Sequence, residues 1–208
     1  MRRALLIVDD QPTFCEGGGL PVEGGNAVSE RIAGFVSARA GDYDEVVASQ
    51  DWHIDPGDHW APEGTEPDFR TTWTRHGQAG TAEADLHPAL RAVLDGDGPQ
   101  LTALVRKGMY AAAYSAFDGV VVDDPDALEP AGPPLAEWLR SRDVTDVDVL
   151  GIATDHCVRA SALDAVTAGL RVRLLADLAT GVAPDTTAAA LDEMAAAGVE
   201  VTTSAAVT

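Results

Sequence analysis

Short apolar runs alternate with stretches of helical periodicity along this chain, and this alternation constrains the fold more than any other feature. Runs rich in Val, Ile and Leu are typical of strands buried on both faces of a parallel sheet. Six such runs span residues 4–8, 46–49, 101–105, 147–152, 172–176 and 199–202. The alternation of strands with helices predicts a three-layer α/β/α sandwich with right-handed crossovers.

Three of the intervening stretches carry apolar residues at the spacing of one helix face. They lie within residues 28–36, 158–170 and 188–195. We expect Gly169 and Gly198 to end the second and third of these helices, because glycine readily adopts the left-handed conformation found there. Asp185 or Thr186 is the expected N-cap of the third helix.

The length and composition are those of one globular domain. The chain has 208 residues, of which 46% are hydrophobic and 23% charged, so we predict a single domain over residues 1–208. No apolar run reaches the ~18 residues of a membrane span. Residues 1–9 are too short and end too acidic for a signal peptide, and we therefore expect a cytoplasmic protein.

The chain is strongly acidic. Its 14 basic and 34 acidic residues give a formal net charge of −20. A field of that sign repels nucleic acids and anionic membranes, so we expect neither as a partner, and it disfavours a strongly anionic substrate. Solubility alone is the alternative explanation of the charge. The sequence is compatible with a monomer or a homo-oligomer.

Reactive residues follow three of the predicted strands, at the edge where open α/β sheets bind ligands. We expect a six-stranded, mainly parallel sheet of order 3-2-1-4-5-6, in which strands one and four are neighbours. Asp9 ends the first strand and Cys157 begins the helix after the fourth, so these two residues should meet. Lys107 follows the third strand, and the loop over residues 106–118 would have to bring it back to the first.

These three residues have the chemistry of a base, a nucleophile and a cation. A thiol at a helix N-terminus meets unpaired N–H groups, which would lower its pKa and can hold an oxyanion. A carboxylate such as Asp9 is seldom core, because an unpaired buried charge is costly. Lys107 is the only lysine of the chain, which favours a role that arginine cannot fill. The alternatives are a buried small cysteine, a capping aspartate and a surface lysine.

Four candidate metal ligands lie within 26 residues, and they are Asp51, His53, His59 and His76. Period two places Asp51 and His53 on one face at the end of the second strand. One carboxylate and three imidazoles suit one divalent transition metal (Zn, Fe or Mn) better than Ca or Mg. A histidine-rich surface loop is the alternative interpretation.

Other residues give weaker signals. We interpret His87 and Cys15 as structural, and helix geometry makes His156 a poor proton partner for Cys157. Five loop aromatics either anchor the loops or form a slot for a flat ligand. They are Trp52, Trp60, Trp73, Tyr110 and Tyr114.

Together these residues resemble the nicotinamidase/pyrazinamidase branch of the isochorismatase-like cysteine hydrolases. The resemblance runs nearly end to end, and its sharpest segments read DWHIDPGDH at 51–59 and GIATDHCVR at 151–159. Further matches lie at residues 4–9, 14–18, 73–76, 106–117 and 177–181. The chain departs from the family at Thr13, where an acidic or amide residue is usual, and Pro12 stiffens the same turn.

The resemblance implies a role for each matching position. The catalytic residues would be Asp9 as general base, Lys107 as its partner and Cys157 as nucleophile. A cis peptide bond before Ala153 would aim its N–H, with that of Cys157, at an oxyanion. The implied metal ligands are Asp51, His53, His59 and His76. The implied substrate-binding residues are Phe14, Trp73, Tyr114 and His156.

The implied activity is hydrolysis of nicotinamide to nicotinic acid and ammonia through a cysteine thioester, in NAD salvage. Pyrazinamide is a further expected substrate. One alternative is a metal-independent cysteine hydrolase of another carboxamide or an N-carbamoyl compound. The other is a non-catalytic domain that binds a metal or ligand, which would need no contact between Cys157 and Asp9.

Overall fold

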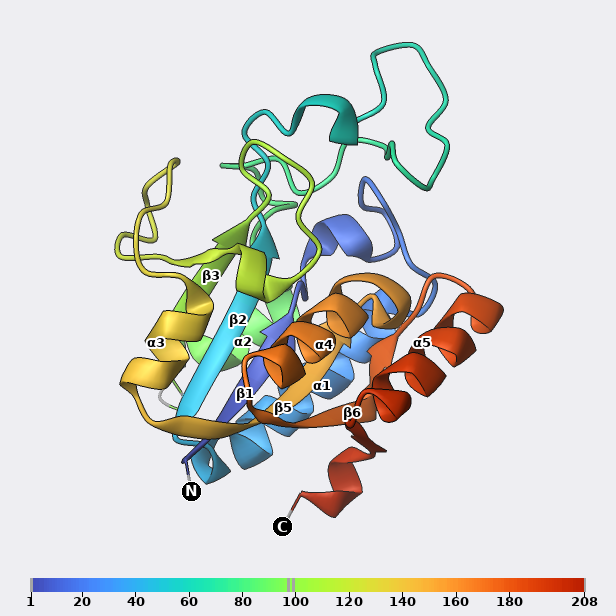
Figure 1. Cartoon of the computed structure of the whole chain (residues 1–208). Helices are drawn as coiled ribbons and strands as arrows, with labels where there is room; N and C mark the ends of the chain where they lie inside the picture. The colour runs from blue at the N-terminus through green and yellow to red at the C-terminus, as the bar shows by residue number, and fades with distance from the viewer. Residues whose placement is uncertain (1, 97, 99, 208) are drawn as a thin grey trace.

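Strand β1 (Arg2–Val8) lies in the middle of the sheet of the computed structural model, which describes residues 2–96, 98 and 100–207. The sheet has seven strands in the order β4-β3-β2-β1-β5-β6-β7 (Figure 1). The other strands are β2 (Glu45–Asp51), β3 (Ala103–Lys107), β4 (Val120–Val121), β5 (Val144–Ile152), β6 (Arg171–Thr180) and β7 (Glu200–Thr202).

The prediction of six strands is wrong by one edge strand. β4 has two residues and pairs antiparallel with β3, and a strand this short leaves no periodicity in the sequence. The other neighbours pair in parallel. Without β4 the order is the predicted 3-2-1-4-5-6, and β1 and β5 are neighbours as expected.

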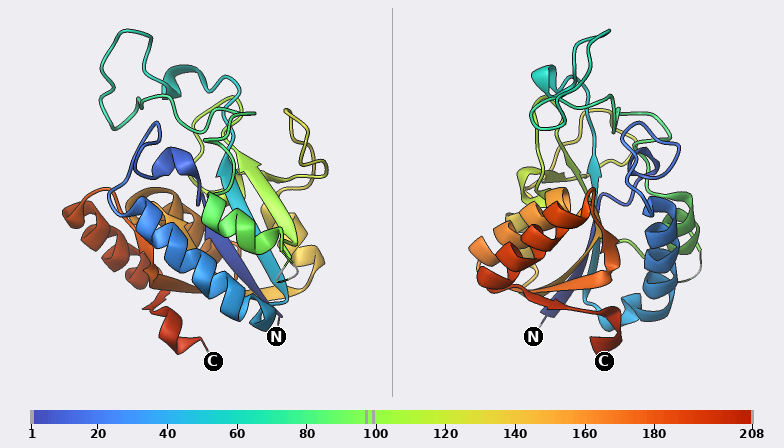
Figure 2. Two further views of the ribbon diagram at one scale, coloured as in Figure 1. Left: turned by 180° about the vertical axis from the view of Figure 1, so that it is seen from behind. Right: turned by 90° about the vertical axis from the view of Figure 1, so that its right-hand side faces the viewer.

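Helices cover both faces of the sheet, as the right-hand view of Figure 2 shows. α1 (Gly25–Arg39) and α2 (Pro88–Leu94) pack on one face. α3 (Leu135–Ser141), α4 (Arg159–Thr167) and α5 (Pro184–Ala196) pack on the other. Alternate residues of β1 enter the two cores, with Leu5 in one and Leu6 in the other.

The three helices predicted from periodicity are confirmed as α1, α4 and α5. Gly169 and Gly198 follow α4 and α5 with φ of +86° and +98°, which is the left-handed conformation expected at a helix end. The predicted N-cap of α5 is wrong. Ala183 is the N-cap, because Pro184 suits the first helical position and starts the helix earlier.

Short helical turns complete the fold. A π-helical turn, Thr154–Val158, joins β5 to α4. The 3₁₀ turns are Pro12–Phe14, Ala40–Asp42, Gly57–His59, Ala116–Asp118 and Ser204–Ala206. Among the described helices, none has the length and apolar character that crossing a membrane requires.

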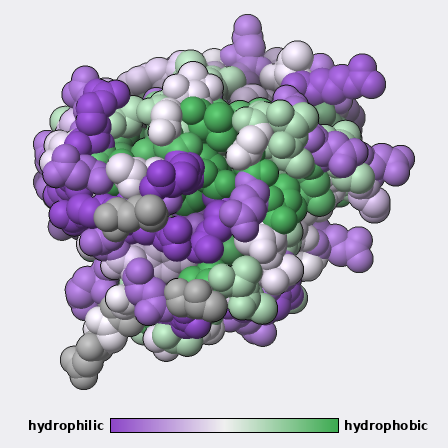
Figure 3. Space-filling model, turned by 60° about the horizontal axis from the view of Figure 1, so that its bottom comes forward, coloured by the Kyte–Doolittle hydropathy of each residue, from purple (hydrophilic) through white to green (hydrophobic). Residues whose placement is uncertain are grey.

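The two ends of the sheet differ. Long connections after β2 and β3 rise above the carboxyl ends of the strands, at the top of Figure 1. Figure 3 brings the opposite end forward, where green apolar side chains gather across the middle of the face with purple polar ones around them. The candidate reactive residues all belong to the end with the long connections.

Candidate active site

Asp9, Lys107 and Cys157 meet at the carboxyl edge of the sheet. Lys107 Nζ lies 2.9 Å from Asp9 Oδ2 and 3.6 Å from Cys157 Sγ. It also donates to the Ala113 carbonyl at 3.1 Å and forms an ion pair with Asp51 Oδ1. Asp9 and Lys107 are fully buried and Cys157 is 7% exposed, so the group is sealed from bulk water except at the thiol.

The prediction that a loop must carry Lys107 back to β1 is wrong. Lys107 is the last residue of β3 and pairs with Asp51 of β2. Its side chain contacts both Asp51 and Asp9, because four methylene groups are long enough to reach past the neighbouring strand. The strand itself therefore positions the ammonium.

Ser49 of β2 fixes the orientation of the Asp9 carboxylate. Its hydroxyl donates to Asp9 Oδ1 at 2.7 Å and accepts the Asp9 N–H at 3.2 Å. The other oxygen of Asp9 faces Lys107, and an oxygen of Asp9 lies within 4.8 Å of Cys157 Sγ. Asp9 is therefore placed to exchange a proton with the thiol.

Burial controls the protonation of this cluster. It raises the pKa of Cys157 well above its usual value, and nearby Asp9 and Asp51 raise it further. The predicted lowering by the helix N-terminus is not found, because desolvation and two carboxylates outweigh Lys107. Burial also raises the pKa of Asp9. The raised pKa favours the neutral thiol at Cys157, so a base would have to take its proton before the sulfur could attack a substrate.

Lys107 keeps its charge in this buried position. Desolvation lowers the pKa of its ammonium, but the attraction of Asp51 and Asp9 outweighs that effect and raises the pKa well above the usual value. Burial raises the pKa of Asp51, and Lys107 with His53 and His76 more than reverses this, so the net direction is downward. Asp51 and Lys107 thus form a buried ion pair beside Asp9.

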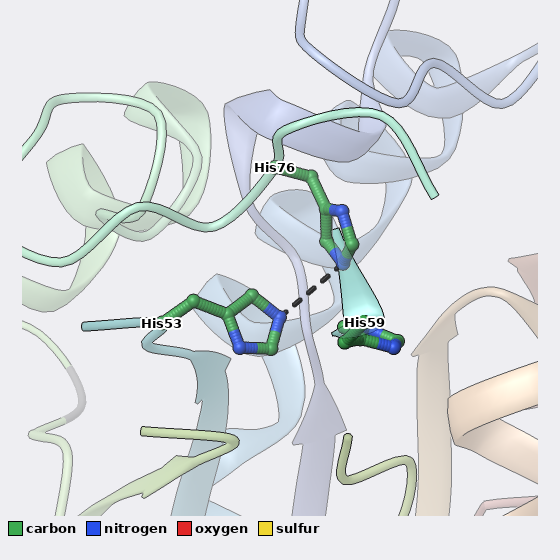
Figure 4. A group of neighbouring side chains, drawn as sticks. All are labelled: His53, His59 and His76. Carbon is green, nitrogen blue, oxygen red and sulfur yellow. Dashed lines mark hydrogen bonds between the residues drawn. The ribbon is translucent and has the colours of Figure 1, made fainter. Parts of the chain in front are cut away.

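His53, His59 and His76 converge just beyond this ion pair (Figure 4). One nitrogen of each ring lies within 4.8 Å of the others, and the Nε2 atoms of His53 and His76 are 3.3 Å apart. Asp51 Oδ2 lies 3.6 Å from His53 Nε2 and 3.7 Å from His76 Nε2. The structure thus brings together all four predicted metal ligands.

The hydrogen bonds of the Nδ1 atoms of His53 and His76 explain why their Nε2 atoms suit a cation. His53 Nδ1 contacts the Gly108 carbonyl at 2.6 Å, and His76 Nδ1 contacts the Thr74 carbonyl at 2.7 Å. A carbonyl accepts only from N–H, which leaves both Nε2 atoms as lone-pair donors that face each other. His59 Nδ1 is buried, and no described group hydrogen-bonds to it. Burial, with His76 and His53 beside it, lowers the pKa of His59 to about 4. Neutral imidazoles and one carboxylate fit a divalent transition metal.

A cavity of about 440 Å³ is lined both by Cys157 and by the metal-ligand candidates Asp51, His59 and His76. Its lining includes Cys157, Ala153 and Asp51, together with all four predicted substrate-binding residues, Phe14, Trp73, Tyr114 and His156. Trp73 Nε1 donates to the Tyr114 hydroxyl at 3.0 Å, and the rings of Trp73 and His156 are 5.3 Å apart. The peptide bond before Ala153 is cis, as the resemblance implied.

Sequence reasoning missed several residues of the cavity wall. Phe69 and Arg70 come from the long loop after β2, and Val182, Ala183 and Thr186 come from the segment after β6. Their position just past a strand end was the signal that could have found the last three. No comparable signal marks Leu20, Pro21 and Val22, which line the cavity from the segment before α1.

Three of the five predicted loop aromatics, Trp52, Trp60 and Tyr110, do not line the cavity. Arg106 lies 3.5 Å over the Trp52 ring, and Trp52 Nε1 donates to the Leu128 carbonyl at 2.7 Å, so Trp52 anchors a loop. Trp60 stacks under Arg75. Tyr110 is exposed, and its hydroxyl pairs with Glu129.

The residues interpreted as structural have structural contacts. His87 accepts the Ala89 N–H and caps α2, and Cys15 is buried and free. Thr13 itself supplies loop hydrogen bonds. Its hydroxyl donates to Glu83 at 3.2 Å and accepts the Gly77 N–H at 3.1 Å. The departure from the family pattern therefore leaves the loop tied down.

The sheet order, the Thr154–Val158 turn that carries the predicted nucleophile Cys157 (the nucleophile turn) and the cluster of Asp9, Lys107 and Cys157 define an isochorismatase-type hydrolase fold. Residues 3–206 match the Isochorismatase domain, and the chain belongs to this family. The chain is 50% identical to the nicotinamidase/pyrazinamidase of Mycobacterium tuberculosis over 198 residues, which cover 95% of this chain and 97% of that protein.

Solved structures extend the comparison. A pyrazinamidase of Pyrococcus horikoshii in complex with zinc has a TM-score of 0.76 at 29% identity and covers 98% of this chain and 99% of that one. A protein from L. infantum in complex with nicotinate has a TM-score of 0.78 at 31% identity, with 99% and 94% covered.

Proposed function

We propose that this protein is a nicotinamidase that hydrolyses nicotinamide to nicotinic acid and ammonia in NAD salvage, and that it also accepts pyrazinamide. One observation carries the proposal. A buried thiol beside a base and an ammonium opens into the same cavity as a cluster of three imidazoles. The relatives named nicotinamidase or pyrazinamidase support this assignment.

The chain's own residues supply the acid–base and covalent steps. Asp9 takes the proton of Cys157, and Lys107 stabilises the negative charge that develops. Cys157 Sγ attacks the carboxamide carbon, and the N–H groups of Ala153 and Cys157 hold the oxyanion, each worth ~3 kcal/mol. Asp9 returns its proton to the departing ammonia, which leaves a thioester.

The second half of the reaction uses the same base. Asp9 takes a proton from a water molecule, and the resulting hydroxide attacks the thioester carbonyl. The bond between carbon and Cys157 Sγ breaks, the thiol recovers its proton, and nicotinic acid is released. The raised pKa values of Asp9 and Cys157 suit this exchange, because both groups can hold the proton.

Asp51, His53, His59 and His76 would hold one divalent transition metal, Zn, Fe or Mn. Such an ion would supply a Lewis acid for the ring nitrogen of the substrate. Phe14 and Trp73 would lie against the two faces of the ring, with Tyr114 and His156 beside it. The aromatic side chains of the cavity and the thiol of Cys157 that opens into it together favour a substrate with a flat ring that carries an amide.

A cysteine exchange tests the assigned nucleophile. Cys157→Ala should lower ammonia release from nicotinamide by at least about 10³-fold, because the covalent step is lost. Cys15→Ala is the matched control, since Cys15 is also a buried cysteine but does not line the cavity, and it should keep near-normal activity. Equal activity in wild type and Cys157→Ala would rule out the nucleophile.

Metal analysis on the same preparations tests the imidazole cluster. We expect about one transition-metal ion per chain in wild type and in Cys157→Ala, and a loss of about tenfold or more in affinity in His59→Ala. His87→Ala is the control, because His87 caps α2 away from the cluster. Metal-free wild-type protein whose activity is undiminished by a chelator would contradict the assignment.

A further inference from the structure

Asp155 belongs to the same turn as Cys157, yet its carboxylate contacts a different part of the chain. Oδ1 accepts the Val182 N–H at 3.0 Å, and Oδ2 accepts the Ala183 N–H at 3.4 Å. The Thr186 hydroxyl also donates to Oδ2. Asp155 is only 6% exposed, so these three donors replace the water that an ionised carboxylate would otherwise need.

These contacts hold the two residues that lead into α5 and one hydroxyl of its first turn. The N-cap of α5 is Ala183, which has no side-chain acceptor for the free N–H groups of the first turn. Asp155 accepts the N–H of Ala183 itself and that of Val182 before it, and its negative charge lies at the positive end of the helix dipole. One carboxylate therefore joins the start of α5 to the turn that carries the nucleophile.

The segment that Asp155 holds, residues 181–186, is a wall of the cavity. Val182, Ala183 and Thr186 line it. Val182 is an apolar side chain left 51% exposed at the cavity, where a bound ligand could cover it. Thr180 Oγ1 donates to the Glu23 carbonyl at 3.1 Å, and in Figure 1 the chain between β6 and α5 runs beside the blue segment before α1.

The nucleophile turn is held by hydrogen bonds that do not involve Asp155, whereas residues 182, 183 and 186 of the cavity wall all donate hydrogen bonds to the Asp155 carboxylate. The N–H groups of His156 and Val158 both donate to the Ala153 carbonyl, at 3.0 and 3.1 Å. The turn also continues directly from β5 into α4. Loss of the Asp155 contacts should therefore release the wall and leave Cys157 in place.

We propose that Asp155 is a positioning residue that sets substrate selectivity by holding the 181–186 wall at a fixed distance from Cys157. The inference rests on the proposed amide hydrolysis. A fixed wall limits the size of the substituents that a ring can carry when its carboxamide lies against the thiol. A released wall should weaken binding of the small substrate and admit a larger one.

The test compares two variants of the tether with one matched control. Asp155→Asn keeps the shape but turns one acceptor into a donor, and Thr186→Val removes one donor. Asp177→Asn is the control, because Asp177 also accepts a backbone N–H and a hydroxyl, both from Ser204 at 2.7 and 2.6 Å, but does not line the cavity. Steady-state kinetics are measured with nicotinamide and with a ring-methylated nicotinamide.

We expect Asp155→Asn to raise KM for nicotinamide ~10-fold and Thr186→Val ~3-fold, with kcat within about threefold of wild type. The preference for nicotinamide over the methylated compound should shrink in both variants. Asp177→Asn should stay within about twofold of wild type in every constant. If KM is unchanged, or if kcat alone falls, Asp155 does not position the wall.

Amide hydrogen exchange gives a second readout that is independent of catalysis. The Val182 and Ala183 amides should exchange at least ~10-fold faster in Asp155→Asn, while the amides of the nucleophile turn keep their rates. Unchanged exchange at both amides overturns the proposal. If the wild type releases no ammonia from nicotinamide, the proposed function fails, and exchange alone decides the tether. If Asp155→Asn does not fold, Thr186→Val decides it by the same criteria.

Discussion

At the scale of single residues, buried charge decides the chemistry of this protein. Lys107 is compensated by Asp9 and Asp51, and it remains an ammonium although it is fully buried. Cys157 is kept as a thiol by the same burial. The sequence identified these residue types and their strand ends, but their protonation states follow from desolvation that only the packed structure produces.

Asp10 offers a prediction about pH and stability. It is fully buried and accepts a hydrogen bond from Ser29, while no described group pairs with its Oδ2. Burial raises its pKa from 3.8 to about 6. The folded state then disfavours the carboxylate, so stability is lost as pH rises from about 4 to about 6, by roughly 3 kcal/mol.

Asp10→Asn should remove this dependence. Relative to wild type, the variant should gain about 2 kcal/mol of stability between about pH 4.5 and about pH 8, less than the full amount because wild type has already lost about 1 kcal/mol by about pH 4.5. Urea unfolding at both pH values measures the difference. Ser29→Ala should shift the wild-type transition to higher pH, because the hydroxyl lowers the Asp10 pKa. Parallel pH profiles of Asp10→Asn and wild type would contradict the argument.

At the scale of elements, the site depends on how closely β1 and β5 approach. Gly151 pairs with Val8 at the carboxyl end of both strands, just before Asp9 and the nucleophile turn. It has φ of +128°, and a Cβ there would clash with the Val8 carbonyl. Glycine at this position therefore lets the two reactive strand ends lie side by side.

Replacement of two glycines separates close approach from simple flexibility. Gly151→Ala should destabilise the fold by about 3 kcal/mol and lower activity, because it forces β1 and β5 apart. Gly34→Ala is the control within α1, where a Cβ meets no atom within 4 Å beyond the neighbouring backbone of its own helix. It should stabilise the protein by about 0.5–1 kcal/mol. Similar shifts of the denaturation midpoint in both variants would refute the clash.

At the scale of the whole molecule, the net charge of −20 should affect the binding of the product more than the binding of the substrate. Nicotinamide is uncharged, whereas nicotinate is an anion that the protein's field repels. Between about 50 mM and about 500 mM salt, kcat/KM for nicotinamide should change less than about twofold. Product inhibition by nicotinate should strengthen at high salt, because screening removes the repulsion. Inhibition that weakens with salt would contradict this view.

The cytoplasmic location and the single domain over residues 1–208 stay predictions.

The sequence by itself determined the class of fold and the residue types of the site. Continuous apolar runs of strand length suit strands that are buried on both faces, and the stretches between them have one apolar face at helical spacing. The two patterns in alternation therefore predict a parallel sheet covered by helices. Those runs also placed Asp9, Asp51 and Cys157 at or just after strand ends on one edge of the sheet, whereas Lys107 was expected to need a loop to reach the first strand. Two-residue β4 and the short helix α3 had too little periodicity to be seen.

Only the tertiary structure decided how these residues work together. Lys107 reaches past β2 to Asp9, and Asp155 is tethered to the segment before α5. The pKa of Cys157 is raised by burial and by carboxylates that are far away in the sequence. Such contacts depend on strand spacing, side-chain length and loss of water, none of which is written in local periodicity. The local sequence pattern determined which segments form helices and strands, and the packing of these elements determined the contacts and protonation states of the site.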